Sequence, residues 1–346
     1  MRVGVDAQLA RGTATGIGEY VRGLMPALSA RGVDVAALDC PALDPWRFDR
    51  RALWDQAVLP LAAARARVDV LHCAAGTMPL VAPAPTVVTV HDVAWLRVQA
   101  HARPYARAYF GRYMLARYAK ADGIVVDSLF SRGELLAVAP LDPARVSVVY
   151  PGVAEDVMRV VRARDDVAPF VLAVGTVEAR KNLEVVVRAL VRLPGLRLVS
   201  VGPPTAYRDR CLELARKLGV AERVEMRGYV PRAEVLELYA RALAAVVPSR
   251  YEGFGYGVAQ ALCAGAPLVC ADAASLPEVA GAHATLVHPD DVDAWVAAVA
   301  SIAADPGAAE RRAGALRAGA RERFAWAASA RAAQNAYALA ALRSSI

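Results

Sequence analysis

The sequence predicts an α/β fold of two doubly wound, Rossmann-like domains that face a cleft. Short valine-rich apolar runs alternate with amphipathic stretches along the whole chain, which is typical of parallel strands covered by helices on both faces. The alternation is interrupted by a charged segment at 159–169 that ends in proline, and then it starts again. A length of 346 residues also suits two domains.

The first expected domain, residues 1–160, contains six candidate strands, at 2–7, 33–38, 68–73, 86–91, 123–127 and 146–150. Helical patterns such as 18–30 and 102–120 lie between them. The second expected domain, residues 169–325, contains candidate strands at 170–175, 196–201, 224–228, 244–247, 268–271 and 284–287. Its helical patterns are at 182–193, 207–218, 232–242, 256–264 and 292–302. The tail at 308–342 is rich in alanine and arginine, and residues 326–346 are expected to form a C-terminal helix.

Composition argues against a membrane-spanning or disulfide-linked protein. No run of about 18 uncharged apolar residues is present. Asp6 comes too early for a secretory signal peptide. The five cysteines are odd in number and scattered, without metal-ligand spacing. These features predict a cytoplasmic location, where thiols stay reduced.

The formal net charge of +7 allows two interpretations. A basic protein suits a polyanionic partner such as a diphosphate or an anionic lipid surface. Alternatively, the charge reflects genomic composition, because Lys120, Lys181 and Lys217 are the only lysines in the sequence and all other basic residues are arginine.

The first motif is a glycine-rich loop at 12–20, between the first strand and the first helix. Its Gly16 would let the backbone come close to a ligand at a helix N-terminus. The spacing is not that of a dinucleotide-binding fingerprint, and a plain tight turn explains it equally well.

The second motif is His91-Asp92, at the end of an apolar strand. A polar pair at the carboxyl end of a parallel strand points into the mouth of the cleft. The alternative is that Asp92 caps the next helix and that the ring of His91 forms hydrogen bonds with nearby groups only.

The third motif, at 175–182, follows the first strand of the second domain and opens a helix. Gly175 ends the strand, and Arg180 and Lys181 can together neutralise a diphosphate. A solvated helix start is the alternative. However, cations oppose the macrodipole at a helix N-terminus, and a bound anion would relieve that conflict.

The fourth and most specific motif, at 248–267, joins a strand to a helix through a glycine-rich turn. Glu252 at the turn can bind sugar hydroxyls, and Gln260 lies about two helical turns further along. Backbone N–H groups at Tyr256 and Gly257 can bind a phosphate. The turn itself consists of Gly253, Phe254 and Gly255.

In this order and spacing the motifs resemble the retaining glycosyltransferase family 4, whose two-Rossmann-domain architecture is called GT-B. The resemblance also covers the segments 125–135, 150–153 and 275–279. The segments 16–20 and 175–182 look most like mannosyltransferases of bacterial surface-polysaccharide assembly.

The resemblance implies a role for each site residue. Arg180 and Lys181 would hold the donor diphosphate, and Glu252 would contact the transferred sugar. His91 would lie near the donor sugar, with Asp92 beside it, and Gly16 would lie near the diphosphate. Position 260 would contact the ribose. The backbone at 229–231, which begins with Tyr229, would face the base. The C-terminal helix would cross back onto the first domain. The family's front-face route uses a donor phosphate oxygen to help deprotonate the acceptor.

The sequence departs from the family pattern at two places. Gln260 stands where the family usually has a second glutamate, and an amide can still accept from one ribose hydroxyl and donate to another. Tyr256-Gly257 replaces the usual leucine-proline, which alters the expected shape of the sugar pocket.

The expected reaction is therefore transfer of a hexose, in the first instance mannose from GDP-mannose, to a glycan or polyprenyl-diphosphate-linked acceptor. No metal, cofactor or nucleic acid is expected. A basic and aromatic segment at 103–120 either lies on an anionic membrane or packs on the sheet with its arginines in water. Two other classes stay open: a nucleotide-sugar isomerase or epimerase of the same architecture, and a non-catalytic nucleotide-sugar-binding module.

Overall fold

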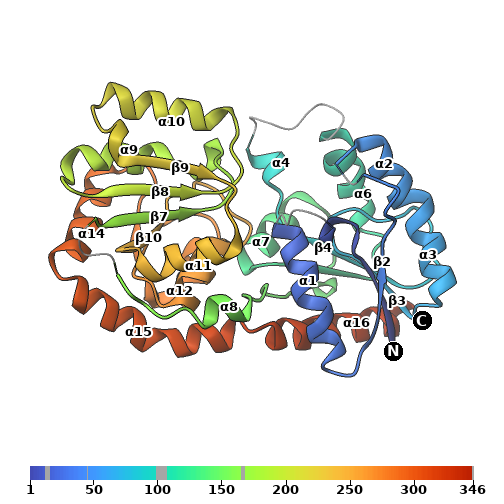
Figure 1. Cartoon of the computed structure of the whole chain (residues 1–346). Coiled ribbons are helices and arrows are strands. Elements are labelled where there is room, and N and C mark those ends of the chain that lie inside the picture. Colours follow the sequence, from blue (N-terminus) through green and yellow to red (C-terminus); the bar gives the residue numbers. More distant parts are fainter. Residues whose placement is uncertain (12–15, 45, 99–106, 165–167, 345–346) are drawn as a thin grey trace. The chain divides into compact units, whose positions relative to one another are not determined.

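The computed structural model describes residues 1–11, 16–44, 46–98, 107–164 and 168–344, with the side chains of residues 107 and 110 also outside the description. The chain forms two compact units. One consists of Met1–Gly152 together with Ala325–Ile346, and the other of Val153–Phe324. Within the described residues, each unit is built on a six-stranded parallel sheet (Figure 1). The predicted α/β, doubly wound fold class is confirmed.

The sheet of the first unit has the order β2-β1-β3-β4-β5-β6. Its strands are β1 Arg2–Asp6, β2 Asp34–Leu38, β3 Val70–Cys73, β4 Thr86–Val90, β5 Gly123–Val126 and β6 Val146–Val148. Its α-helices are α1 Gly16–Ser29, α2 Phe48–Leu53, α3 Leu59–Ala66, α4 Ala94–Arg97, α6 Met114–Tyr118, α7 Leu129–Val138 and α16 Trp326–Ser344. Two segments are π-helical, η2 Trp54–Val58 and η3 Arg107–Tyr113.

The sheet of the second unit has the order β12-β11-β10-β7-β8-β9. Its strands are β7 Phe170–Val174, β8 Arg197–Val201, β9 Val224–Gly228, β10 Ala244–Val247, β11 Leu268–Ala271 and β12 Thr285–Val287. Its α-helices are α8 Glu155–Met158, α9 Leu183–Ala189, α10 Ala206–Lys217, α11 Arg232–Arg241, α12 Tyr256–Ala264, α13 Leu276–Ala280, α14 Val292–Ala304 and α15 Pro306–Arg323. Figure 1 shows α9 and α10 on one face of this sheet and α11 and α12 on the other.

Both faces of the first sheet are buried, as the valine-rich strands predict. Neighbouring residues of a strand point to opposite faces. Val87 and Val125 therefore join one apolar core, which includes α1 and α16, while Val88 and Ile124 join the other. A strand that supplies both cores must be apolar at every position, and this explains the continuous apolar runs in the sequence.

Each expected strand is present, with ends that differ by at most two residues. The N-terminal segment of the first unit ends at Gly152, earlier than the expected domain boundary at residue 160. The alanine-rich tail forms two helices, α15 and α16, which are separated near Phe324. α16 packs on α1 and β5 of the first unit, where alanines such as Ala333 and Ala340 are buried. Small side chains let this helix approach the sheet closely.

The expected helix at 102–120 is only partly described, because residues 99–106 lie outside the described part of the chain. Its described portion consists of the π-helical η3 followed by α6. Among the described residues, no helix has both the length and the apolar character needed to cross a membrane.

Candidate functional site

The topology of the second sheet brings two of the sequence motifs together. The chain runs from β7 outward through β8 and β9, and then returns so that β10 pairs with the other side of β7. The loops after β7 and β10 therefore leave the same edge of the sheet on diverging paths. Ligands of open α/β sheets bind at such a switch point. The motifs at 175–182 and 248–257 are these two loops.

The glycine turn before α12 has a local steric cause. Gly255 has a φ of +93°, and a Cβ added there would lie 2.6 Å from the side chain of Leu276. A non-glycine residue would meet both backbone strain and a clash. Phe254 anchors the turn, because its ring packs edge-on against Tyr256 and Phe324. The turn leads directly into α12, which begins at Tyr256.

Glu252 lies at the centre of this site and is only 6% exposed. Its Oε2 accepts a hydrogen bond from Arg180 Nη1 at 2.8 Å. Its Oε1 accepts from Ser249 Oγ at 2.8 Å and from Lys181 Nζ. Ser275 Oγ donates to its backbone oxygen at 2.9 Å. The carboxylate is therefore held by two cations and a hydroxyl.

The electrostatics of the cluster keep Glu252 ionised. Burial by itself raises the pKa of this carboxyl, but the charges of Lys181 and Arg180 outweigh it and bring the pKa to about 2. Arg180 also pairs with Glu178 at 2.7 Å and donates to the carbonyl oxygen of Tyr251 at 3.0 Å. The side chains of Arg180 and Lys181 stay about one-fifth exposed, at 23% and 21%. Both cations can therefore still be reached by a ligand.

Two glycines, Gly175 and Gly202, leave the backbone near Lys181 without side chains. Gly175, with a φ of +135°, lies so close that its added Cβ would be 3.7 Å from Lys181 Nζ. An added Cβ on Gly202 would lie 2.1 Å from the carbonyl oxygen of Gly175. Gly202 was not predicted from the sequence. It ends the valine-rich β8 as Gly175 ends β7, and this parallel could have identified it.

The other predicted residues of the second unit lie on α12, in the turn before it and after β9. Gln260 is half-buried on α12, and its Oε1 accepts from Tyr239 Oη at 3.3 Å. Tyr229 follows β9 and is 63% exposed. Gly253 is buried in the turn. A Cβ added to Gly257 would lie 3.5 Å from the carbonyl oxygen of Val174.

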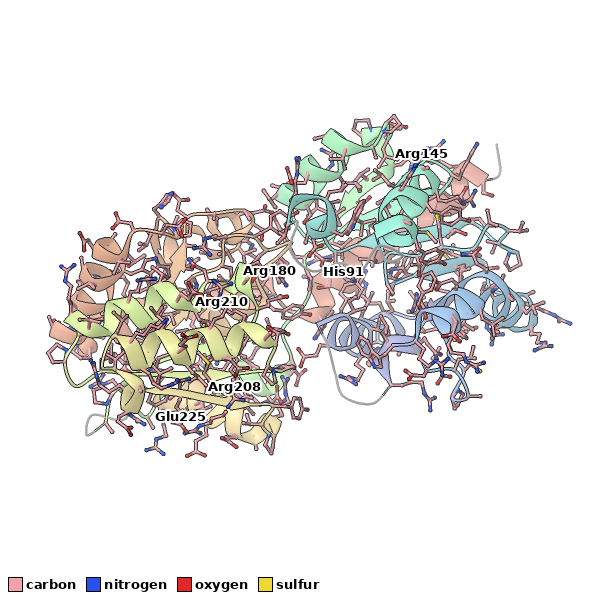
Figure 2. All side chains as sticks on the ribbon, turned by 90° about the horizontal axis from the view of Figure 1, so that it is seen from above. His91, Arg145, Arg180, Arg208, Arg210 and Glu225 are labelled. Carbon is pink, nitrogen blue, oxygen red and sulfur yellow. The ribbon has the colours of Figure 1, made fainter. Side chains whose placement is uncertain are left out.

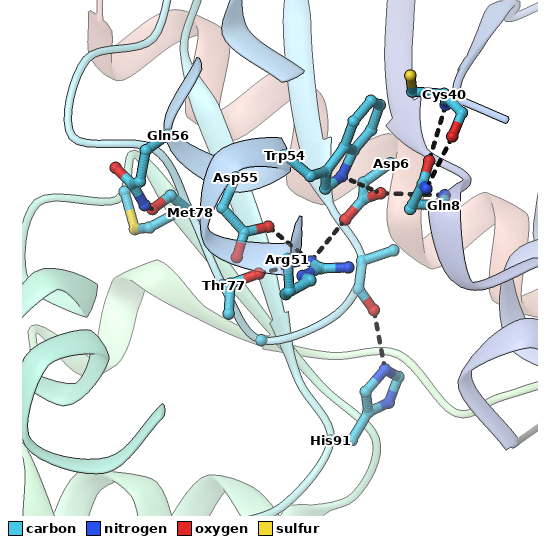
Figure 3. Close-up of polar contacts among 12 residues, drawn as sticks. Asp6, Gln8, Cys40, Arg51, Trp54, Asp55, Gln56, Thr77, Met78 and His91 are labelled. Atoms are coloured by element: carbon cyan, nitrogen blue, oxygen red, sulfur yellow. Dashed lines mark hydrogen bonds and ion pairs between the residues drawn. The ribbon is translucent and has the colours of Figure 1, made fainter. Parts of the chain in front are cut away.

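In the first unit, His91 follows β4 and both of its ring nitrogens have partners. Nδ1 lies 2.6 Å from Asp127 Oδ2. Nε2 lies 3.0 Å from the carbonyl oxygen of Ala74 (Figure 3). The side chain of Asp92 accepts from the backbone N–H of Ala94 at 2.9 Å, at the start of α4. His91 and, in the second unit, Arg180 are labelled in Figure 2.

The glycine loop at 12–20 is only partly described. Residues 12–15 lie outside the described residues, and Gly16 is exposed at the start of α1. Gly18 has a clear packing role, since an added Cβ would lie 2.6 Å from the carbonyl oxygen of Leu9.

A buried charge cluster in the first unit was not predicted from the sequence (Figure 3). Arg51 Nη2 donates to Asp6 at 2.9 Å and to Thr77 at 2.6 Å, and it lies 2.8 Å from Asp55. Trp54 Nε1 also donates to Asp6, at 3.0 Å. Asp6 ends β1, which lies between β2 and β3 at the switch point of this sheet. Its position at the carboxyl end of a strand is the same signal that singled out His91.

The cluster joins the two π-helical segments. Tyr109 Oη of η3 donates to Asp55 of η2 at 3.0 Å. Burial raises the pKa of Asp55 to about 6, although Arg51 acts in the opposite direction. π-Helical turns are rare and often occur at functional sites.

Comparison with solved structures supports the fold. The chain superposes on sucrose-phosphate synthase from Thermosynechococcus elongatus with a TM-score of 0.78 and 21% identity, covering 98% of both chains. It superposes on the Anabaena protein HepE, solved in complex with UDP and glucose, with a TM-score of 0.72 and 15% identity, covering 97% of this chain and 98% of the other. At these identities the likeness concerns the fold alone.

Sequence comparisons identify the family. The chain is 32% identical over 197 residues to the D-inositol 3-phosphate glycosyltransferase of Mycobacterium marinum, a match that covers 52% of this chain and 42% of that protein. The chain thus aligns with less than half the length of this curated relative. The family model "Glycosyl transferases group 1" matches residues 155–322, and "Glycosyltransferase Family 4" matches residues 14–157. Because these two matches overlap at 155–157 and together extend over residues 14–322, the chain belongs to glycosyltransferase family 4.

Proposed function

We propose that this protein is a retaining glycosyltransferase that moves a hexose from a nucleoside-diphosphate sugar to a hydroxyl group of its acceptor. The observation that carries the proposal is the buried carboxylate of Glu252, paired with both Arg180 and Lys181 at the switch point of the second sheet. A cation pair beside a carboxylate offers separate partners for a diphosphate and for sugar hydroxyls. Family membership supports the same reaction class.

The diphosphate exchanges partners with Glu252 in this proposal. Arg180 and Lys181 already donate to one carboxylate, and a diphosphate presents several oxygens of the same kind with greater charge. The amino end of α12, at Tyr256 and Gly257, adds the positive end of a helix dipole. Gly175 leaves room beside Lys181 for a phosphate to approach the backbone.

The same groups would stabilise the transition state. Negative charge grows on the diphosphate as the glycosidic bond breaks, and fixed cations next to it lower the barrier. Glu252, released from part of its ion pairing, would accept hydrogen bonds from hydroxyls of the transferred sugar. Gln260 would contact the ribose and the backbone near Tyr229 the base. A donor phosphate oxygen would help to deprotonate the acceptor on the same face of the sugar.

The donor is proposed as a nucleoside-diphosphate hexose, and two candidates are to be compared directly. GDP-mannose is proposed from the sequence pattern at 16–20 and 175–182. UDP-glucose is suggested by the ligands named for the Anabaena protein. In a thermal-shift panel, a donor present at 100 times its Kd adds about 2.7 kcal/mol to the free energy of unfolding. Donor consumption with label appearing in a glycan or lipid acceptor then tests transfer itself.

The acceptor is proposed to be a glycan or a polyprenyl-diphosphate-linked glycan, met at an anionic membrane surface. Arg112 and Lys120 are exposed in the described part of the basic and aromatic segment 103–120, and Leu80 and Val81 are exposed nearby. Arg117 ties the two parts together by donating to the carbonyl oxygen of Leu80 at 2.9 Å. Exposed apolar side chains beside cations suit shallow peripheral contact.

Two other functions make different predictions in the same assay. An isomerase or epimerase would convert the donor into a changed sugar and free nucleotide without any acceptor. A non-catalytic binding module would give the thermal shift and no turnover with any acceptor. Acceptor-dependent release of the nucleoside diphosphate would exclude both.

A further inference from the structure

The ring of His91 is held at both nitrogens by groups that accept hydrogen bonds. The carbonyl oxygen of Ala74 can only accept, so Nε2 at 3.0 Å must carry a hydrogen. Asp127 Oδ2 lies 2.6 Å from Nδ1, the short distance typical of a charge-assisted bond. If Asp127 is ionised, Nδ1 also carries a hydrogen and the ring is an imidazolium.

The surroundings raise the pKa of both partners: burial and the charge of Asp92 raise the pKa of Asp127, although the charge and hydrogen bond of His91 act in the opposite direction. Burial lowers the pKa of His91, but the charge and hydrogen bond of Asp127 and the carbonyl of Ala74 act against it, and the net direction is upward. Four titratable groups face the ring or its partner: Asp127 after β5, Asp92 next in the chain, Tyr20 from α1 and His72 from β3. Tyr20 presents its ring at about a right angle, with 5.2 Å between centroids. It is neutral, because burial raises its pKa above the usual range.

His72 in the same unit is the natural contrast. Its Nε2 lies 2.7 Å from Thr89 Oγ1 and its Nδ1 lies 2.9 Å from Tyr337 Oη. Hydroxyl groups both donate and accept, so they satisfy a ring with one proton. Burial lowers the pKa of His72 to about 3, and this ring is neutral. The unit thus contains a buried and a half-buried histidine whose pKa values are shifted in opposite directions.

We propose that Asp127 is a positioning residue that holds the His91 ring as an imidazolium with both N–H groups committed inside the first unit. His91 then has no nitrogen lone pair with which to take a proton from an acceptor hydroxyl. It contributes a fixed ring to the site and does not act as the general base. The conclusion that His91 is not the general base rests on the proposed transfer reaction. The protonation state of the ring, however, can be tested without measuring any activity.

The first test is nuclear magnetic resonance of the full chain labelled with ¹⁵N-histidine. Long-range ¹H–¹⁵N spectra distinguish doubly protonated from singly protonated rings, and His91→Gln assigns the His91 signals. We expect two protonated nitrogens for His91 at pH 7 and a neutral pattern for His72 in the same spectrum. A neutral pattern for His91 at pH 7 would overturn the proposal.

The second test is Asp127→Asn, with Asp34→Asn as control because Asp34 is an exposed aspartate on β2. The amide cannot supply the charge, so the imidazolium signals of His91 should disappear in Asp127→Asn and persist in the control. Turnover should fall on the order of 10- to 100-fold through loss of orientation, with affinity for the bare nucleoside diphosphate kept. Persistence of the imidazolium signals in Asp127→Asn would refute the positioning role. Absence of transfer by the unmodified protein would refute the proposed function alone.

Discussion

Arg180 Nη1 donates to Glu252 Oε2 at 2.8 Å, although the two residues are 72 positions apart in the sequence. Lys181 binds the other oxygen of the same carboxylate. Two motifs that were interpreted separately from the sequence, one as a diphosphate site and one as a sugar site, are therefore a single charge cluster.

Removing either cation should weaken binding of the bare nucleoside diphosphate. Arg180→Ala and Lys181→Ala are each expected to cost about 1.5–3 kcal/mol of binding free energy, the range for hydrogen bonds to charged groups. Isothermal titration calorimetry measures this directly. Arg192→Ala and Lys217→Ala are matched controls, since both side chains are exposed and pair with other residues. Unchanged affinity in both site variants would remove these residues from the diphosphate site.

Removing the Glu252 side chain should lower turnover without weakening diphosphate binding. Glu252→Ala is expected to lower turnover at least tenfold, or about 1.4 kcal/mol of transition-state stabilisation. The bare diphosphate should bind as tightly as before or more tightly, because the carboxylate no longer competes for Arg180 and Lys181. Steady-state kinetics and calorimetry on one preparation provide both values. Loss of diphosphate affinity in Glu252→Ala would contradict the assigned roles.

Position 260 should act on the nucleotide part of the donor. Gln260→Ala is expected to weaken the complete donor and the bare diphosphate by a similar factor, because both contain the ribose. Gln260→Glu should keep activity and tighten donor binding, since an ionised acceptor makes hydrogen bonds roughly twice as strong. Calorimetry with both ligands separates these outcomes. An effect of Gln260→Ala on the sugar-containing donor alone would place the side chain at the sugar instead.

The ion cluster should stabilise the fold in a pH-dependent way. The pKa of Glu252 is about 2 in the folded protein, below the ordinary value of 4.5. A lowered carboxyl pKa contributes stability that is present above pH 4.5 and lost as the pH falls towards 2. Urea denaturation at pH 7, 4.5 and 3.5 should show this loss, and Glu252→Gln should reduce it. If the free energy of unfolding falls equally with pH in both proteins, other carboxyl groups cause the loss of stability.

Membrane association should depend on the exposed cations of the first unit. The double variant Arg112→Glu, Lys120→Glu is expected to reduce co-sedimentation with anionic vesicles, because each removed charge near an anionic surface costs about 1 kcal/mol. Binding of the unmodified protein should also fall with added salt. Arg192→Glu, Lys217→Glu changes the charge equally on the second unit and is the control. Equal binding to neutral vesicles would contradict an electrostatic contact.

Much of the fold could be predicted because it depends on local patterns. A strand covered on both faces needs an apolar residue at every position, and a glycine turn ends it. These signals identified β7 and β10 to within a residue. The C-terminal helix expected at 326–346 matches α16, but α15 was not set apart from it by composition, because alanine and arginine favour a helix on either side of Phe324.

The sequence by itself determined the twelve strands and the residue types of the site: two cations, a carboxylate and a glycine turn. Only the tertiary structure decided which of these side chains meet. Arg180 reaches Glu252 because β7 pairs with β10, and Arg51 of α2 reaches Asp6 because the segment formed by α2 and η2 lies against the end of β1. The ring protons of His91 likewise depend on Asp127, which comes from a neighbouring strand. A linear pattern fixes the period of an element, whereas contacts between distant loops depend on strand order, which the local pattern does not specify.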